Sequence, residues 1–204
     1  MYDEAKNQVL KAKVIERAGN PKFKHHQWFV TFHLEIVEQI SGELCEIYPE
    51  ADSLQVQALV WLHDYEKIID FDNQYNTELL ATRELMREVG YPPATIEAMA
   101  AQLNFYNAKQ QLATAPIETQ IVSSADGASH LIAPFFPFYW HEHPGESVAL
   151  LQAENRRKAA VDWDRKITLP EVKKSFAARR EWFMELSGQL PERYLLPGVG
   201  KKAA

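Results

Sequence analysis

The chain has little of several features that mark other classes of protein. Its 204 residues include one cysteine, Cys45, which excludes an internal disulfide framework and a metal site built from several thiolates. No apolar run is long enough to span a bilayer, and residues 1–20 lack the apolar stretch of a secretory signal. The formal net charge of −6 argues against a basic surface for nucleic acid. These absences predict a soluble, cytoplasmic protein that binds neither nucleic acid nor membrane.

Alternation of apolar and polar residues, the pattern of a half-buried strand, is also almost missing. Apolar residues instead recur at helical spacing, and capping residues, glycines and prolines bound the segments. Helices are predicted over residues 4–18, 27–48, from 52 or 53 to 63, 76–90, 94–105, 116–132, 146–163 and 170–188. The proline-rich aromatic stretch 134–145 is predicted to be a loop. The fold class is therefore all-α.

The predicted organisation is a single helical bundle with additional C-terminal helices. With 46% hydrophobic residues, the chain can bury one sizeable core. Residues 1–20 are expected to form an N-terminal helix that packs on this core. Residues 21–190 form the main domain, and residues 191–204 are expected to be a disordered tail.

Ligand-type side chains interrupt three of the apolar helix faces. His33 lies in the second predicted helix, and His63 and Asp64 directly follow the apolar run of "LVWLHDYEKIIDF". Asp126 lies within "IVSSADGASHL", a stretch of small and apolar residues. Burying an unpaired carboxylate costs several kcal/mol or forces it to take up a proton, so each residue needs a partner. Two imidazoles and two carboxylates together suit a divalent metal, with coordination positions left for water and substrate.

Each of these residues taken alone has a more ordinary explanation. A single histidine on an apolar face, such as His33, is more often a hydrogen-bonded core residue than a ligand. A His-Asp pair also occurs in helix caps and ion pairs, and Asp126 could cap a local kink. The order His, then His-Asp, then Asp, each on a separate helix, favours the metal interpretation.

The same residues resemble the H…HD…D signature of the HD-domain metal-dependent phosphohydrolases, which are all-helical. "QALVWLHDYEK" is similar to the family's usual "AALLHDIGK", and "IVSSADGASHL" to its "IVxDADxL". The resemblance covers residues 21–132, with a weaker likeness in "DWDRKITLPEVKK". It implies an HD domain over residues 21–190, in which His33, His63, Asp64 and Asp126 hold one divalent metal ion. Imidazole ligands favour manganese, iron, cobalt or nickel over calcium, and magnesium is also acceptable.

The chain departs from the family members that bind two metals through extra histidines after the HD pair. Where those histidines would fall, it has Asn76, Asn104 and Asn107. One metal is therefore expected, which weighs against the di-iron oxygenase and binuclear cyclic-dinucleotide phosphodiesterase branches. Glu66 replaces the family's usual glycine, so the turn there is expected to differ.

Residues beside the expected ligands are candidates for the chemistry. Asp64 is expected to orient the attacking water as, or beside, the general base, with Glu66 as a second candidate base. Lys67 lies one turn after His63, close enough to reach a phosphate oxygen. The ordinary explanations are a surface carboxylate for Glu66 and a solvated lysine at a helix end for Lys67.

More distant residues are candidates for substrate binding. His130 is four residues after Asp126, so it could contact a leaving-group oxygen or simply hydrogen-bond a carbonyl. Arg156 and the two cations after it could clamp phosphate, although a solvated helix face is the more ordinary role. In the aromatic stretch, Tyr139 and Trp140 could form a base-stacking lid, whereas core packing is the ordinary role of its phenylalanines.

The expected function is hydrolysis of a phosphoester of a nucleotide or another small phosphorylated metabolite. A non-catalytic HD module that senses a nucleotide or has a regulatory role is the alternative. A helical interaction protein with a structural metal is less favoured, because two histidines and two aspartates do not make the closed thiolate-rich site of structural zinc. The partner is thus a small phosphorylated molecule, and the sequence is also compatible with a homodimer.

Overall fold

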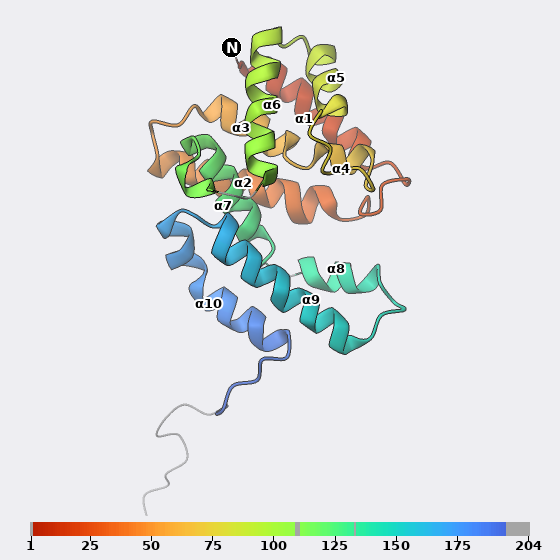
Figure 1. The fold of residues 1–204 in the computed structure, drawn as a ribbon, viewed down its shortest axis with the longest axis vertical. Coiled ribbons are helices and arrows are strands. Elements are labelled where there is room, and N and C mark those ends of the chain that lie inside the picture. The colour runs from red at the N-terminus through yellow and green to blue at the C-terminus, as the bar shows by residue number, and fades with distance from the viewer. Residues whose placement is uncertain (1, 109–110, 133, 195–204) are drawn as a thin grey trace, which may run out of the picture.

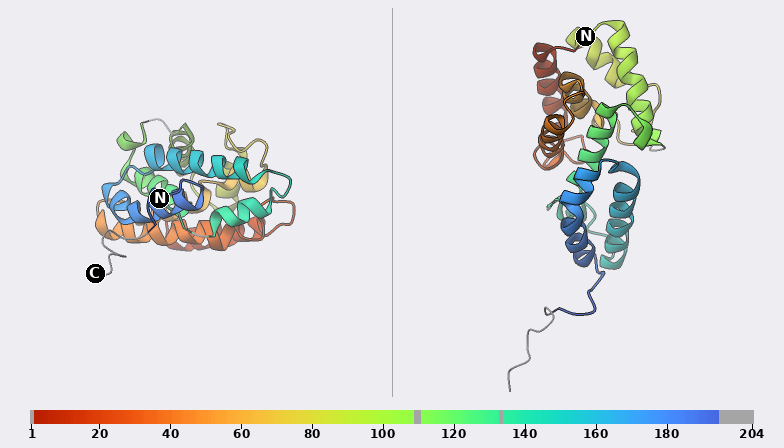
Figure 2. Two further views of the ribbon diagram at one scale, coloured as in Figure 1. Left: turned by 90° about the horizontal axis from the view of Figure 1, so that it is seen from below. Right: turned by 90° about the vertical axis from the view of Figure 1, so that its left-hand side faces the viewer.

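The computed structural model describes residues 2–108, 111–132 and 134–194. Within these residues the chain forms helices joined by turns and contains no strand, which confirms the all-α class. Helices α1, α5 and α6 lie at one end of an elongated molecule, and α8, α9 and α10 lie at the other (Figures 1 and 2). Helices α2 and α7 lie between the two ends.

The α-helices are α1 (Glu4–Ala18), α2 (Glu35–Ile47), α3 (Ser53–Leu62), α4 (Tyr65–Ile69), α5 (Leu80–Val89), α6 (Pro93–Ala108), α7 (Ile117–Ser129), α8 (Phe135–His141), α9 (Val148–Val161) and α10 (Pro170–Leu186). Two π-helical turns, Val30–Leu34 and Asp162–Lys166, and a 3₁₀ turn, Leu112–Thr114, complete the regular structure of these residues.

Capping residues begin and end several helices where the sequence predicts. The Asp52 carboxylate accepts hydrogen bonds from the N–H groups of Leu54 and Gln55, which have no partner inside α3. Gly90 ends α5 with a φ of 89°, a conformation that glycine adopts without strain. Of the two starts predicted for α3, 52 or 53, the structure has Asp52 as the cap, and α5 is capped at the predicted residue 90.

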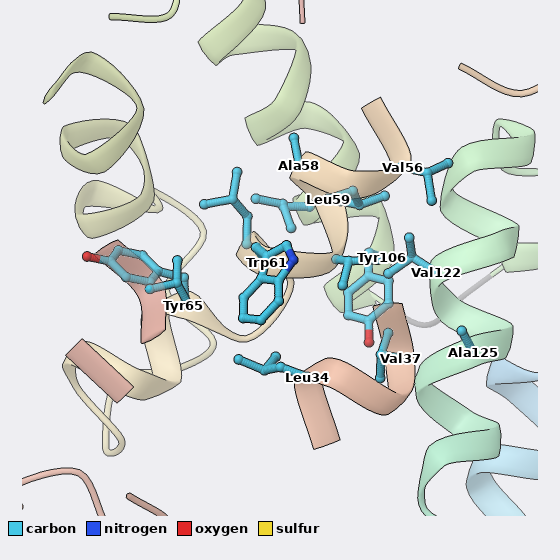
Figure 3. Packing of buried hydrophobic residues seen from close by; sticks show 14 of the residues in the cluster. Leu34, Val37, Val56, Ala58, Leu59, Trp61, Tyr65, Tyr106, Val122 and Ala125 are labelled. Atoms are coloured by element: carbon cyan, nitrogen blue, oxygen red, sulfur yellow. The ribbon is translucent and has the colours of Figure 1, made fainter. Parts of the chain in front are cut away.

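The core lies where α2, α3 and α7 meet. Its apolar side chains include Leu34, Val37, Leu59 and Val122, all less than about a tenth exposed (Figure 3). Full burial of such a side chain contributes roughly 1.5–3 kcal/mol before the entropy of ordering it is subtracted. Helix α7 is buried from residue 121 through residue 129, which small residues make possible. It can therefore carry polar groups into the centre of the molecule.

The stretch 134–145, predicted to be a loop, instead contains helix α8. Pro134 precedes this helix and Pro137 lies in its first turn, where a missing N–H breaks no intrahelical hydrogen bond. Phe135 and Phe136 are buried and pack against each other with ring centroids 5.3 Å apart. The prediction of a loop was wrong because both prolines lie where a helix tolerates them.

Other predicted helices differ from the observed ones mainly at their ends. The helix expected over 27–48 consists of the π-helical turn followed by α2, and α5 begins at Leu80 rather than near residue 76. The short helix α4 was not predicted. Residues 191–194 follow α10 without regular structure, and residues 195–204 of the predicted tail lie outside the described residues. Among the residues that the structure describes, no helix is both long and apolar enough to cross a membrane.

A close approach between α7 and the turn 162–166 generates a stability prediction. A Cβ atom at Gly127 would lie 2.9 Å from Ile167 Cγ1 and 3.1 Å from Lys166 Cβ. Gly127→Ala should therefore lower the free energy of unfolding by about 1–2 kcal/mol, although alanine is the better helix former. Gly42→Ala in α2, where a Cβ meets nothing within 4 Å, should raise it by about 0.5–1 kcal/mol. Urea unfolding of both variants checks this, and equal stabilisation would contradict the close approach.

Candidate metal centre

His33 reaches the core from a π-helical turn. In this turn the N–H of Glu35 bonds the C=O of Val30, five residues earlier. Such a turn adds one residue to the helical repeat and is common at functional sites. The His33 side chain is completely buried, with its ring centroid 4.8 Å from that of Phe29.

His63 and Asp64 lie in the break between α3 and α4. Neighbouring residues in an unbroken helix point in directions about 100° apart and do not face a common point. Here α3 ends at Leu62 and α4 begins at Tyr65, so the backbone changes direction at the two residues between them. The break explains how both side chains face His33.

The four ligands expected from the sequence meet around His33. Its Nε2 atom lies 3.3 Å from Nε2 of His63, 3.5 Å from Oδ2 of Asp64 and 3.8 Å from Oδ1 of Asp126. His130 joins this cluster, because its Nε2 atom lies 3.4 Å from Asp126 Oδ1. The rings of His33 and His130 stack with centroids 5.1 Å apart and planes 3° apart. Ligand atoms lie within 4.8 Å of one another in two groups of three residues. One group is His33, Asp126 and His130, and the other is His33, His63 and Asp64.

The Nδ1 atoms of the three histidines already have partners. His33 Nδ1 lies 3.0 Å from Ser129 Oγ, His63 Nδ1 lies 2.6 Å from the Val60 carbonyl, and His130 Nδ1 lies 2.9 Å from Asp162 Oδ2. Carbonyl and carboxylate oxygens only accept hydrogen bonds here, and the Ser129 hydroxyl gives its proton to the Asp126 carbonyl at 2.7 Å. Each Nδ1 therefore carries a proton, and Nε2 is the ring nitrogen that faces the other ligands.

Hydrogen bonds also fix the orientation of the Asp126 carboxylate. Its Oδ2 atom accepts hydrogen bonds from the Tyr106 hydroxyl and the Lys166 ammonium group. Burial raises the pKa of Tyr106 well above its ordinary value, so the hydroxyl keeps its proton. Oδ1 stays directed at His33 and His130. Partners that orient ligands from behind are typical of metal sites.

The protonation states also suit a metal ion. Burial lowers the pKa of His33 to about 3, so its imidazole is neutral at neutral pH. Burial alone would raise the pKa of Asp64 and of Asp126, but Lys67 and Lys166 outweigh it and hold both pKa values well below the usual range. Neutral imidazoles and ionised carboxylates are the forms that bind metals. The donor set therefore fits one divalent transition metal ion.

Two cluster residues, Asp162 and Lys166, were not among the sequence-based candidates, whereas Lys158 is one of the two cations after Arg156 that were. Asp162 accepts from His130 and lies 3.2 Å from Lys158 Nζ, and Lys166 also lies 3.9 Å from Asp162. These three residues are spaced four apart on the α9 side, a spacing that places them on one helix face. That spacing was the available signal, but the charged segment "DWDRK" is equally typical of a solvated face.

Two predicted site residues make other contacts. Glu66 accepts a hydrogen bond from the Thr82 N–H at 2.8 Å, in the first turn of α5. Arg156 donates to the carbonyl of Ser187 and ties α9 to the end of α10. Neither contact tests the expected roles of base for Glu66 and phosphate clamp for Arg156, which stay predictions.

A pocket lies beside the cluster, between α4, α8, α9 and the turns around residues 25–28 and 71–75. Its volume is about 360 Å³, and Lys67, Tyr139 and Lys158 are among its lining residues. Lys67 Nζ lies 3.0 Å from Asp64 Oδ2, and the Asp64 side chain is 24% exposed. Lys67 thus connects the pocket to Asp64, the most exposed of the clustered carboxylates.

Comparison with known proteins gives no match for this chain to a family model, to a curated protein or to a solved structure. The description of the centre therefore rests on its own geometry.

The burial of neutral histidine predicts a pH dependence of stability in metal-free protein. The unfolded chain protonates His33 near pH 6.5, whereas the folded chain does so only near pH 3. The contribution of His33 to the free energy of unfolding is therefore fully present above pH 6.5 and is lost as the pH drops toward 3. At pH 5 the loss from this residue alone is about 2 kcal/mol. His33→Gln should flatten the decline between pH 6.5 and 4.5 measured by urea unfolding. His141→Gln, at an exposed position, should leave the slope unchanged, and an equal slope in all three proteins would contradict the assignment.

The donor set predicts selective metal binding. Metal-free protein should bind about one equivalent of Mn²⁺ or Co²⁺ in equilibrium dialysis, and a free concentration of 100 Kd should stabilise the fold by about 2.7 kcal/mol. His33→Ala should abolish the binding, and His141→Ala should retain it. Stoichiometric calcium with no transition metal, or two transition metal ions per chain, would contradict this prediction.

Proposed function

We propose that this protein is a metal-dependent phosphohydrolase of the HD type, acting on a phosphoester of a nucleotide or another small phosphorylated metabolite. The observation that carries the proposal is the convergence of His33, His63, Asp64 and Asp126 on one buried point. Their order along the chain is that of the H…HD…D signature. The cytoplasm is the proposed location.

The residues around the pocket have complementary roles in the proposed reaction. A bound divalent ion would supply Lewis-acid polarisation of a phosphoryl oxygen and activate water. Asp64, which lies 3.0 Å from the pocket-lining Lys67, orients that water and accepts its proton. Lys67 neutralises charge on the phosphoryl oxygens. Water oxygen bonds to phosphorus as the ester P–O bond breaks, and the proton that Asp64 accepted passes to the leaving oxygen. The products are an alcohol and inorganic phosphate.

The enzyme is distinguished from a nucleotide-sensing module by release of phosphate. A panel of nucleotides and sugar phosphates incubated with Mn²⁺ should include at least one substrate. Asp64→Ala and His63→Ala should each lower kcat/KM by about a hundredfold or more, because each removes a ligand. Lys67→Met should act mainly through KM, and Asp72→Ala, at an exposed position nearby, should have wild-type activity.

Nucleotide binding without phosphate release from any ester would favour the sensing module. Full activity in Asp64→Ala would exclude the proposed mechanism directly.

A further inference from the structure

The pocket beside the metal centre contains two lysines that are each paired with an aspartate of the cluster. Lys67 Nζ lies 3.0 Å from Asp64 Oδ2, and Lys158 Nζ lies 3.2 Å from Asp162 Oδ2. Both lysines line the pocket. A phosphoryl group beside Asp64 would therefore meet two ammonium groups, from α4 and from α9.

The third cation of the lining is already neutralised. Arg157 donates two hydrogen bonds to one oxygen of Glu154, at 2.7 and 2.9 Å, and both residues line the pocket. The Glu154 carboxylate would in addition repel a second phosphoryl group at this rim. Beyond the two lysines and this paired arginine, the described residues of the lining include no Lys or Arg that could meet a di- or triphosphate.

Much of the remaining wall is aromatic. Phe71, Tyr75, Phe135 and Tyr139 all line the pocket. The Phe135 ring also packs on His130 with centroids 4.3 Å apart, so this wall continues into the metal cluster. Aromatic walls favour a flat ring by stacking, and the volume of about 360 Å³ is at the small end for ligand pockets.

The net charge of the cluster favours a ligand with two negative charges. Its acidic and basic residues are Asp64, Asp126, Asp162, Lys67, Lys158 and Lys166. Three carboxylates and three ammonium groups cancel, so a divalent ion leaves two positive charges in a partly buried site. A phosphate monoester dianion restores neutrality, whereas a triphosphate overshoots it, and uncompensated buried charge is costly.

We propose that this pocket selects a phosphate monoester whose organic part carries a flat aromatic ring, with the phosphoryl group held between Lys67 and Lys158, and that it discriminates against di- and triphosphates. This inference rests on the proposed function, which orients the ester with its phosphoryl group toward the metal. Lys158 is then the specificity-determining residue, rather than the neighbouring Arg156.

Phosphonates test the proposal by binding alone, because their C–P bond is not hydrolysed. Calorimetry on Mn²⁺-loaded protein should find phenylphosphonate bound about tenfold more tightly than methylphosphonate. Methylenediphosphonate should bind more weakly than phenylphosphonate. Removal of the metal should weaken the binding of all three phosphonates.

Variants locate the selectivity in the pocket. Lys158→Met should weaken phenylphosphonate binding by at least about tenfold, since a hydrogen bond to a charged group is lost. Lys158→Arg should retain most of the affinity, and Lys174→Met, at an exposed position in α10, should retain all of it. Glu154→Gln removes the negative charge that pairs with Arg157. It should therefore reduce the difference in affinity between methylenediphosphonate and phenylphosphonate.

The outcomes separate this inference from the proposed function. If the predicted ranking and the Lys158 effect appear but no ester releases phosphate, the pocket assignment stands and the hydrolase proposal falls. If an ester is hydrolysed while methylenediphosphonate binds as tightly as phenylphosphonate, or Lys158→Met binds normally, the pocket assignment is wrong.

Discussion

One completely buried imidazole, that of His33, is the contact on which the rest of this arrangement depends. Its Nε2 atom lies within 3.8 Å of side chains from the α3–α4 break and from α7, while its Nδ1 atom is bound to Ser129. A buried polar group without partners costs about 1–3 kcal/mol, so the surrounding helices must hold those partners in register. The apolar packing of α2, α3 and α7 does so, because these helices bury their apolar faces against one another (Figure 3).

Departures from regular α-helix direct several of the polar side chains of the cluster. His33 lies in one π-helical turn, and Asp162 and Lys166 lie at the ends of the other, where the N–H of Ile167 bonds the Asp162 carbonyl five residues earlier. His63 lies at the break after α3. Each departure changes the direction of a side chain that an ideal helix would aim elsewhere. The cluster is thus assembled from these three interruptions together with Asp126 and His130, which α7 supplies from its buried C-terminal half.

The all-α fold and the cluster residues His33, His63, Asp64 and Asp126 could be predicted from the sequence, because both follow from the pattern of apolar residues along the chain. A histidine or aspartate among apolar neighbours must be buried, and a buried one needs a partner, so His33 and Asp126 stood out. Asp162 did not, because its neighbours are charged and its burial depends on how α9 is rotated against α7. The same rotation decides that Lys158, rather than Arg156, lines the pocket. Helical spacing alone does not determine that rotation.

The ion pairs of the cluster divide into a sealed side and an open side. Lys166 and Asp126 have side chains only 9% and 2% exposed, whereas Lys67 and Asp64 are 20% and 24% exposed. Removing one member of a fully buried pair strands the other charge, which typically costs about 3–5 kcal/mol, so the Lys166 contact belongs to the fold. A partly exposed pair contributes much less to stability and can exchange partners with a ligand. Because Asp64 is at once a candidate ligand and the exposed member, an arriving anion would meet the centre at the side where rearrangement is least costly.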